Sequence, residues 1–199
     1  MDGVKVTELD ATGYPEKIVG TPTESHAGRS QGTLHLSTIY RDMESEAQLR
    51  KRKDATPDEL LWYAAGGYLW EHVFSMAYRE AVVSGDLVRP DEWERDGIVG
   101  SPDHIDVPNW RIIELKFRWM SAQKFDQLER HFWLELVQIK GYCKMIGTVE
   151  AELWVFFCCG NWRPPVPMVR GIHLQFSEQE IEESWAMIVS HARRKGWLP

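Results

Sequence analysis

The sequence predicts an α/β fold in which helices cover a central mixed sheet. Segments with helical and strand-like patterns follow one another in the order helix, strand, strand, helix, strand, strand, helix. The chain has 199 residues, which suits one domain. Hydrophobic residues make up 43% of the chain, so a substantial core can form.

The first segments divide the chain into an arm and a folded domain. Residues 1–33 contain Gly, Pro, Thr and Ser without periodicity, and we expect a flexible N-terminal arm there. Residues 34–199 are expected to form a single domain. Ser37 is a candidate cap for its first helix, which we expect to end near Arg52.

A second helix has a stronger start signal. Thr56 is a good N-cap, a proline follows it, and Glu59 completes a capping box. The apolar spacing continues to about Val82. Gly66 and Gly67 interrupt this pattern, which indicates either a kink or the close approach of another segment.

Two strand-like segments follow and read as a hairpin. Residues 96–107 form the first, with an irregular Gly-Ser-Pro inside it. Pro108 and Asn109 are turn residues. Residues 110–117 (WRIIELKF) form the second strand, which is rich in β-branched and aromatic side chains.

The remainder of the chain predicts a helix over 123–146 and two strands over 151–159 and 168–176. Ser177 and Glu180 form a second capping box, which starts a last helix. The three cysteines, Cys143, Cys158 and Cys159, are expected to be small hydrophobic residues on a buried strand.

Composition excludes several classes of protein. The net charge of −7 argues against a protein that coats nucleic acid, although an acidic enzyme can still carry a basic groove. Three cysteines, two of them adjacent, do not fit a disulfide framework, a zinc site or an iron–sulphur cluster. Without a membrane-length apolar run or a secretion signal, we expect a cytoplasmic protein that does not associate with membranes.

The second hairpin strand carries the residues that point to chemistry. Because side chains two apart share a strand face, Glu114 and Lys116 point the same way. Burying such charges without partners is unfavourable, and active sites are where proteins accept it. Asp103 on the preceding strand could lie beside Glu114. Asp106 is an alternative, but it would face the other way on a regular strand.

These groups would suit a divalent cation. Two carboxylates, from Asp103 and Glu114, with the Leu115 carbonyl make an all-oxygen site of the kind that Mg²⁺ or Mn²⁺ prefers. Lys116 could position the attacking water or stabilise charge on a phosphate. The sequence therefore favours metal-dependent hydrolysis of a phosphodiester.

The same residues resemble the signature of the PD-(D/E)XK nuclease superfamily, in its RecB-like and phage exonuclease branch. The resemblance covers about residues 37 to 160. It rests on Pro102-Asp103, Glu114-Leu115-Lys116, the Q-x-x-x-Y pattern of Gln138 and Tyr142, and the acidic Glu71 on the preceding helix. It implies a restriction-endonuclease-like α/β core.

The resemblance also implies roles for other residues. Glu71 would be a further metal-binding or catalytic carboxylate. Gln138 and Tyr142 would contact the DNA backbone or brace Lys116. Lys140 and Lys144 lie on the same predicted helix and could contact phosphates, although each is most simply a solvated charge.

Together these observations predict a Mg²⁺- or Mn²⁺-dependent deoxyribonuclease without an iron–sulphur cluster, acting in a bacterial cell or a phage-infected host. The branch resemblance favours an exonuclease over an endonuclease. DNA is the expected partner, and a homo-oligomer is left open. Two alternatives are a DNA-binding module of the same fold with weak catalysis, and an assembly protein whose carboxylates are ordinary surface charges.

Overall fold

The computed structural model describes residues 33–47, 57–120, 122, 125, 127–158 and 168–199. The helices are α3 (Leu36–Glu46), α4 (Pro57–Ala77), α5 (Arg79–Ser84), α6 (Leu128–His131), α7 (Trp133–Ile146) and α8 (Glu178–Arg194). The strands are β1 (Leu34–His35), β2 (Leu87–Val88), β3 (Trp93–Arg95), β4 (Ile98–Gly100), β5 (His104–Asp106), β6 (Arg111–Arg118), β7 (Glu150–Phe157) and β8 (Met168–Gln175). None of the helices in these ranges is long and apolar enough to span a membrane.

The strands form two sheets rather than the single sheet that the sequence predicts. The larger sheet has the order β2-β5-β6-β7-β8, and the smaller has the order β1-β4-β3. The predicted strand over 96–107 is therefore broken, because the chain leaves β4 in one sheet and enters β5 in the other between Gly100 and His104. A proline within that segment supplies no N–H for a ladder, which favours a break there.

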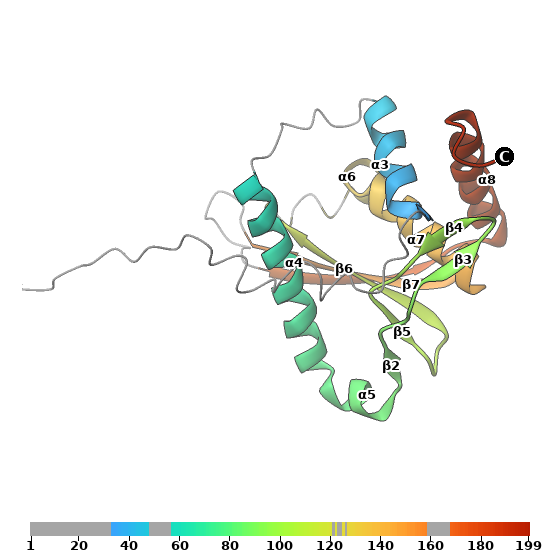
Figure 1. The fold of residues 1–199 in the computed structure, drawn as a ribbon. Helices are drawn as coiled ribbons and strands as arrows, with labels where there is room; N and C mark the ends of the chain where they lie inside the picture. The colour runs from blue at the N-terminus through green and yellow to red at the C-terminus, as the bar shows by residue number, and fades with distance from the viewer. Residues whose placement is uncertain (1–32, 48–56, 121, 123–124, 126, 159–167) are drawn as a thin grey trace, which may run out of the picture.

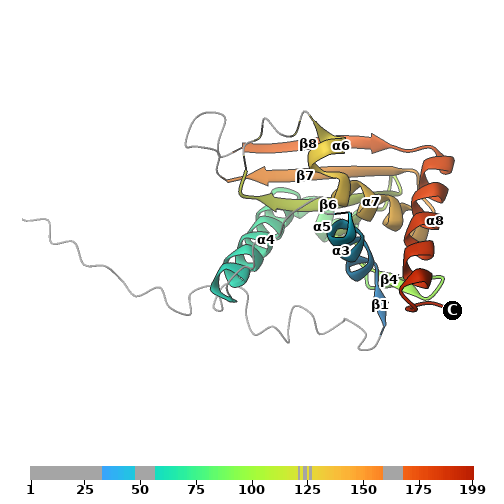
Figure 2. The same cartoon turned by 90° about the horizontal axis from the view of Figure 1, so that it is seen from above.

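The hairpin prediction is confirmed, since β5 and β6 pair antiparallel. Strand β6 then pairs parallel with β7, and β7 pairs antiparallel with β8. Parallel neighbours need a long crossover connection. Helices α6 and α7 provide it, so α7 lies over the strand that carries Glu114 and Lys116 (Figure 2).

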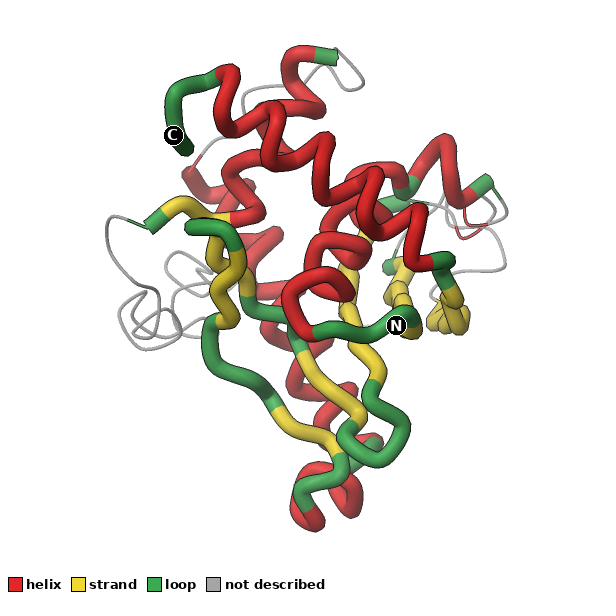
Figure 3. Tube along the Cα trace, turned by 90° about the vertical axis from the view of Figure 1, so that its right-hand side faces the viewer, coloured by secondary structure: helices red, strands yellow, loops and turns green. Residues whose placement is uncertain are grey.

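Helices cover both faces of the larger sheet. Helices α3, α6, α7 and α8 lie above it in Figure 1, whereas α5 and the end of α4 lie below, and Figure 3 shows helical segments on both sides of the strands. Strand β6 contributes to both cores, because Ile112 packs in the larger core with α3, α7 and α8. Its alternate residues Ile113 and Leu115 pack against Trp70 and Phe74 of α4.

Local packing explains the two glycines of α4. A Cβ on Gly66 would lie 2.5 Å from the ring of Phe117, whereas a Cβ on Gly67 would meet nothing within 4 Å. The helix continues through both positions and is interrupted only at Tyr78. The close approach at Gly66 is made by the side-chain ring of Phe117 rather than by another backbone, and neither glycine interrupts the helix.

Several boundaries differ from the sequence prediction. Helix α3 begins at Leu36 with His35 as an N-cap that makes no side-chain hydrogen bond, so the predicted cap at Ser37 is wrong. The helix predicted over 123–146 is divided at Phe132 into α6 and α7. The capping box of Ser177 is confirmed at the start of α8.

Cys143 lies on helix α7 and Cys158 directly after β7, so neither lies within a strand. Residues 1–32 and the capping residue Thr56 lie outside the described residues, as does Cys159.

Candidate active site and metal centre

The register of the hairpin sets the relation between Asp103 and Glu114. His104 pairs with Ile113 and Ile105 with Ile112, so the next position places Asp103 directly opposite Glu114. Residues opposite one another on antiparallel strands have side chains on the same face. The two carboxylates therefore lie on one face of the sheet, at the point where β5 begins.

A hydrogen bond holds Asp103 in this position. The Leu115 N–H donates to Asp103 Oδ2 at 2.7 Å, which replaces the ladder bond that is missing beyond the end of β5. The N–H and C=O of one strand residue point to the same neighbouring strand. The Leu115 carbonyl is thus directed to the same side of β6 as the Asp103 carboxylate.

Asp106, the alternative to Asp103, has a different role. It accepts hydrogen bonds from Arg111 Nε and Asn109 Nδ2, each at 2.8 Å, within the hairpin turn. The pKa of Asp106 is held below its usual value by these hydrogen bonds and by the charge of Arg111, which together outweigh the opposing effect of burial. Its place in the turn favours Asp103 as the partner of Glu114.

Glu114 and Lys116 form a buried pair. The Glu114 side chain is 1% exposed and the Lys116 side chain 17%, and the Lys116 ammonium donates to Glu114 Oε1. Burial, and then the charge of Asp103, raise the pKa of Glu114 well above its usual value despite the opposing effect of Lys116. The second oxygen, Oε2, is buried without a hydrogen-bond partner.

Two tyrosines close the wall behind this pair, and one of them was missed from the sequence. Tyr40 of α3 is buried, and burial raises the pKa of its hydroxyl while the nearby charge of Lys116 opposes the rise. Tyr142 of α7 is buried too, and its pKa is raised well above 10.0, first by burial and next by Glu114. Only the close packing of α3 on the sheet reveals Tyr40.

Gln138 and Tyr142 lie together as their spacing predicts. Gln138 Nε2 donates to the Tyr142 hydroxyl at 3.0 Å, and the two residues are 8% and 5% exposed. Burial of this degree favours the bracing role over contact with the DNA backbone. Gly100 supports the arrangement, because a Cβ there would lie 2.8 Å from the Tyr142 ring.

Glu71 of α4 lies at the edge of the same site. Burial, and next the charge of Asp103, raise the pKa of Glu71 to about 7, while Arg89 and Lys116 act in the opposite direction. Its carboxylate is 3.3 Å from the Arg89 guanidinium. Arg89 directly follows β2 and was not singled out by its sequence context.

Lys140 and Lys144 are not brought to this site. Lys140 lies 3.7 Å from Glu180 and over the ring of Phe176, and Lys144 pairs with Glu182. Both side chains are thus directed to α8. Their contact with DNA stays a prediction from the sequence.

The donor set at the hairpin fits a divalent cation. The Asp103 and Glu114 carboxylates lie on one face of the sheet, and the buried Glu114 Oε2 has no hydrogen-bond partner among the described residues. Glu71, Asp103 and Glu114 are not drawn as tightly together as a complete metal-ligand set. Among the described residues, one trio has its ligand atoms all within 4.8 Å, and it is Asp42, Glu46 and His191.

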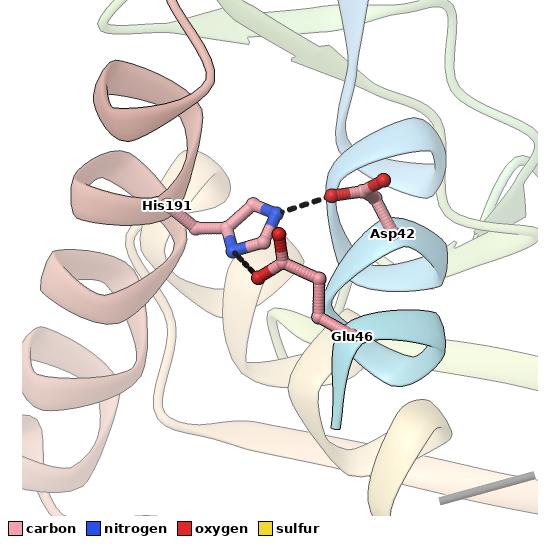
Figure 4. A group of neighbouring side chains, drawn as sticks. All are labelled: Asp42, Glu46 and His191. Atoms are coloured by element: carbon pink, nitrogen blue, oxygen red, sulfur yellow. Dashed lines mark hydrogen bonds and ion pairs between the residues drawn. The ribbon is translucent and has the colours of Figure 1, made fainter. Parts of the chain in front are cut away.

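This second trio, which the sequence did not reveal, joins α3 to α8 (Figure 4). His191 Nε2 is 2.7 Å from Asp42, and Lys195 Nζ is 2.7 Å from both Asp42 and Glu46. Arg194 Nη2 lies 2.8 Å from Glu46. Because two basic side chains already balance the two carboxylates, the cluster is an interhelical ion-pair network.

Comparison with known proteins shows the fold. No known protein family and no curated protein sequence matches the chain. A phage-related exonuclease from Haemophilus somnus 129PT is similar in structure, with a TM-score of 0.51 and 15% identity over 94% of this chain and 92% of that one. The protein SSO0001 has a TM-score of 0.50 and 13% identity, over 92% and 86% of the two chains. The predicted α/β core is thereby confirmed as a fold that the chain shares with these two proteins.

Proposed function

We propose that this chain is a metal-dependent deoxyribonuclease. The observation that supports the proposal most directly is the placement of Asp103 opposite Glu114 on one face of the sheet, with Lys116 beside them. A buried carboxylate with one unpartnered oxygen is unfavourable for stability, and active sites are the usual reason for keeping one.

The residues divide the work between them. Asp103, Glu114 and the Leu115 carbonyl would hold Mg²⁺ or Mn²⁺, with Glu71 as an additional ligand. Such a cation would lower the pKa of a water and take up charge that develops on the phosphate. Lys116 would position a water for in-line attack on phosphorus, and its ammonium would stabilise the negative charge of the phosphoryl oxygens.

The surrounding side chains keep this arrangement rigid. Tyr40 and Tyr142 exclude water from the buried side of Glu114, because both are nearly inaccessible to solvent. Gln138 fixes the Tyr142 hydroxyl through its hydrogen bond. Rigid support of this kind matters because a charged group must be held in place before the reaction begins.

We infer that DNA ends are the substrate, so that the enzyme is an exonuclease. The support is the name of the structural neighbour, a phage-related exonuclease, together with the motif resemblance. A DNA-binding module of the same fold is the alternative, and the complete set of Asp103, Glu114 and Lys116 argues against it. A homo-oligomer stays a prediction that the molar mass in solution tests.

The test of nuclease activity uses purified protein and linear duplex DNA with Mg²⁺, Mn²⁺ or EDTA. We expect degradation with either cation and none with EDTA. Lys116→Ala should reduce the rate by roughly a hundredfold or more while Mn²⁺ binding, measured by calorimetry, is retained. Asp103→Asn and Glu114→Gln should weaken both activity and Mn²⁺ binding.

Arg79→Ala is the control, because it removes a positive charge from an exposed residue of α5 that has no proposed role in the reaction. It should retain most of the activity. An equal loss in the Lys116 and Arg79 variants would contradict the role given to Lys116, and DNA that is bound but never cut would favour the binding module. Covalently closed circular DNA separates the modes of cutting, since an exonuclease leaves it intact.

A further inference from the structure

A pocket that Glu71 helps to line takes no part in the proposed reaction. Its volume is about 360 Å³, within the range of sites that hold small ligands. Helix α4 forms one wall, and the start of β5 and the residue after β2 form the other. The polar side chains that line it are Tyr68, Glu71, His72, Ser75, Arg89 and His104.

His104, which lines this pocket, has a buried nitrogen without a hydrogen-bond partner. The residue is 6% exposed, and its ring packs 5.7 Å from that of Phe74. Its Nδ1 is buried without a hydrogen-bond partner. Buried polar atoms are normally satisfied, so this nitrogen, on a residue that lines the pocket, is an exception among the described residues.

Arg89 provides positive charge at the mouth of the same pocket. Its side chain is 61% exposed, and within the described part of the chain it forms one ion pair, with Glu71 at 3.3 Å. The residue extends the register of β2 and β5 by one position, which places it opposite His104 on the face that α4 covers. Arginine binds phosphate well because its planar guanidinium can donate two parallel hydrogen bonds.

Glu71 pairs with Arg89 and would also be a ligand of the proposed cation, so Arg89 and the cation would compete for the same carboxylate. This competition would connect the pocket to the proposed metal centre. A carboxylate that binds a divalent cation attracts an arginine less strongly, because most of its negative charge is already neutralised. Arg89 is then free to meet an anion. In the absence of such a cation, the same carboxylate would repel a phosphate from the pocket.

We propose that Arg89 is a DNA phosphate-binding residue of the pocket beside the metal centre, and that cation binding by Glu71 makes it available. The inference rests on the proposed nuclease function and adds a second contact with the substrate to it. Metal and DNA then bind with positive coupling, because each favours the arrangement in which Glu71 and Arg89 are apart.

The test measures DNA binding rather than cutting. The anisotropy of a labelled duplex is titrated with protein in EDTA and in Ca²⁺, and the DNA is then checked to be intact. Wild type should bind more tightly in Ca²⁺. Arg89→Gln should lose about tenfold in affinity in Ca²⁺, as expected for one charged hydrogen bond, and change little in EDTA. Its Ca²⁺ affinity, measured by calorimetry without DNA, should be no weaker than that of wild type, because Arg89 competes with the cation for Glu71.

Arg79→Gln is the matched control, because it removes the same charge from an exposed residue of α5 outside this pocket. It should bind DNA as wild type does in both buffers. Glu71→Gln provides a complementary arm, because an amide holds Arg89 weakly. DNA binding in EDTA should then tighten, and this gain should vanish in the double variant with Arg89→Gln.

The outcomes separate the two proposals. If wild type cuts DNA but Arg89→Gln binds it equally well in Ca²⁺, the phosphate role of Arg89 is wrong and the nuclease stands. A gain from Glu71→Gln that persists without Arg89 also overturns the inference, because it reflects net charge alone. If wild type neither binds nor cuts DNA with any cation, both proposals fail.

Discussion

Replacing Glu71 by glutamine should stabilise the protein at alkaline pH in EDTA. The substitution keeps the shape of the side chain and removes its ability to ionise. Glu71 lies on α4 at the edge of the candidate site, where burial and the charge of Asp103 both disfavour the carboxylate. A residue kept for metal binding is expected to destabilise the protein in this way when the cation is withheld.

The size of the effect follows from the pKa of Glu71. A rise from 4.5 to about 7 corresponds to roughly 3 kcal/mol, at about 1.4 kcal/mol for each pH unit. This stabilisation of the protonated folded state is fully present below pH 4.5 and is lost as the pH rises through about 7. Glutamine retains it at every pH. The side chain is 25% exposed, so solvent screening makes roughly 3 kcal/mol an upper bound.

Urea unfolding followed by tryptophan fluorescence measures the difference. Glu71→Gln should exceed wild type in free energy of unfolding by up to roughly 3 kcal/mol at pH 8.5 in EDTA, and by less than about 1 kcal/mol at pH 5. Excess Mg²⁺ should reduce this difference in free energy of unfolding. Wild type should bind Mg²⁺ better than Glu71→Gln and should therefore be stabilised more by it. Glu94→Gln, at an exposed position of β3, should change stability by less than about 0.5 kcal/mol. A Glu71→Gln protein that is no more stable than wild type at pH 8.5 would refute the reasoning.

Three further predictions concern the helix glycines, the metal centre and the α3–α8 network. Gly66→Ala should destabilise the protein by about 1–3 kcal/mol, because its Cβ would meet the ring of Phe117. Gly67→Ala should stabilise it by about 0.5–1 kcal/mol, because its Cβ would meet nothing. A Gly66→Ala protein that is more stable to urea than Gly67→Ala would contradict this packing. Mn²⁺ affinity in calorimetry should rise between pH 6 and 8 as Glu71 loses its proton, and a flat profile would argue against that carboxylate as a ligand. Asp42→Asn should lower the thermal midpoint at pH 7, because a hydrogen bond from Lys195 is the first cause of the lowered pKa of Asp42. The ionised Asp42 stabilises the folded protein above pH 3.8, and this contribution is lost as the pH falls through the lowered pKa of Asp42. The difference in thermal midpoint between wild type and Asp42→Asn should therefore shrink below pH 3.8.

Local sequence signals predicted the parts of the fold that depend on neighbouring residues. The capping box at Ser177 requires only Glu180 three positions later, and the structure contains it. The alternation along residues 110–117 likewise assigned Glu114 and Lys116 to one strand face. Asp103 could be matched to Glu114 because a short hairpin has few registers.

Features that depend on distant residues could not be predicted in this way. Strands β1 to β3 have only two or three residues each, which is too short for a periodic pattern. Arg89 and Glu71 meet only because β2 lies beside α4. His191 and Asp42 are separated by 149 positions, and no local pattern connects them.

The ion-pair network between α3 and α8 affects the order in which the proposed active site is completed during synthesis. Tyr40 lies on α3, two residues before Asp42, and α3 is fastened to a helix that follows every other described element in the sequence. During synthesis, Asp103, Glu114 and Lys116 emerge from the ribosome well before α8 does. Helix α3, which carries Tyr40, therefore gains its anchor on α8 after these three residues have been synthesised, so a nascent chain would carry the side chains of the proposed active site before it had this support.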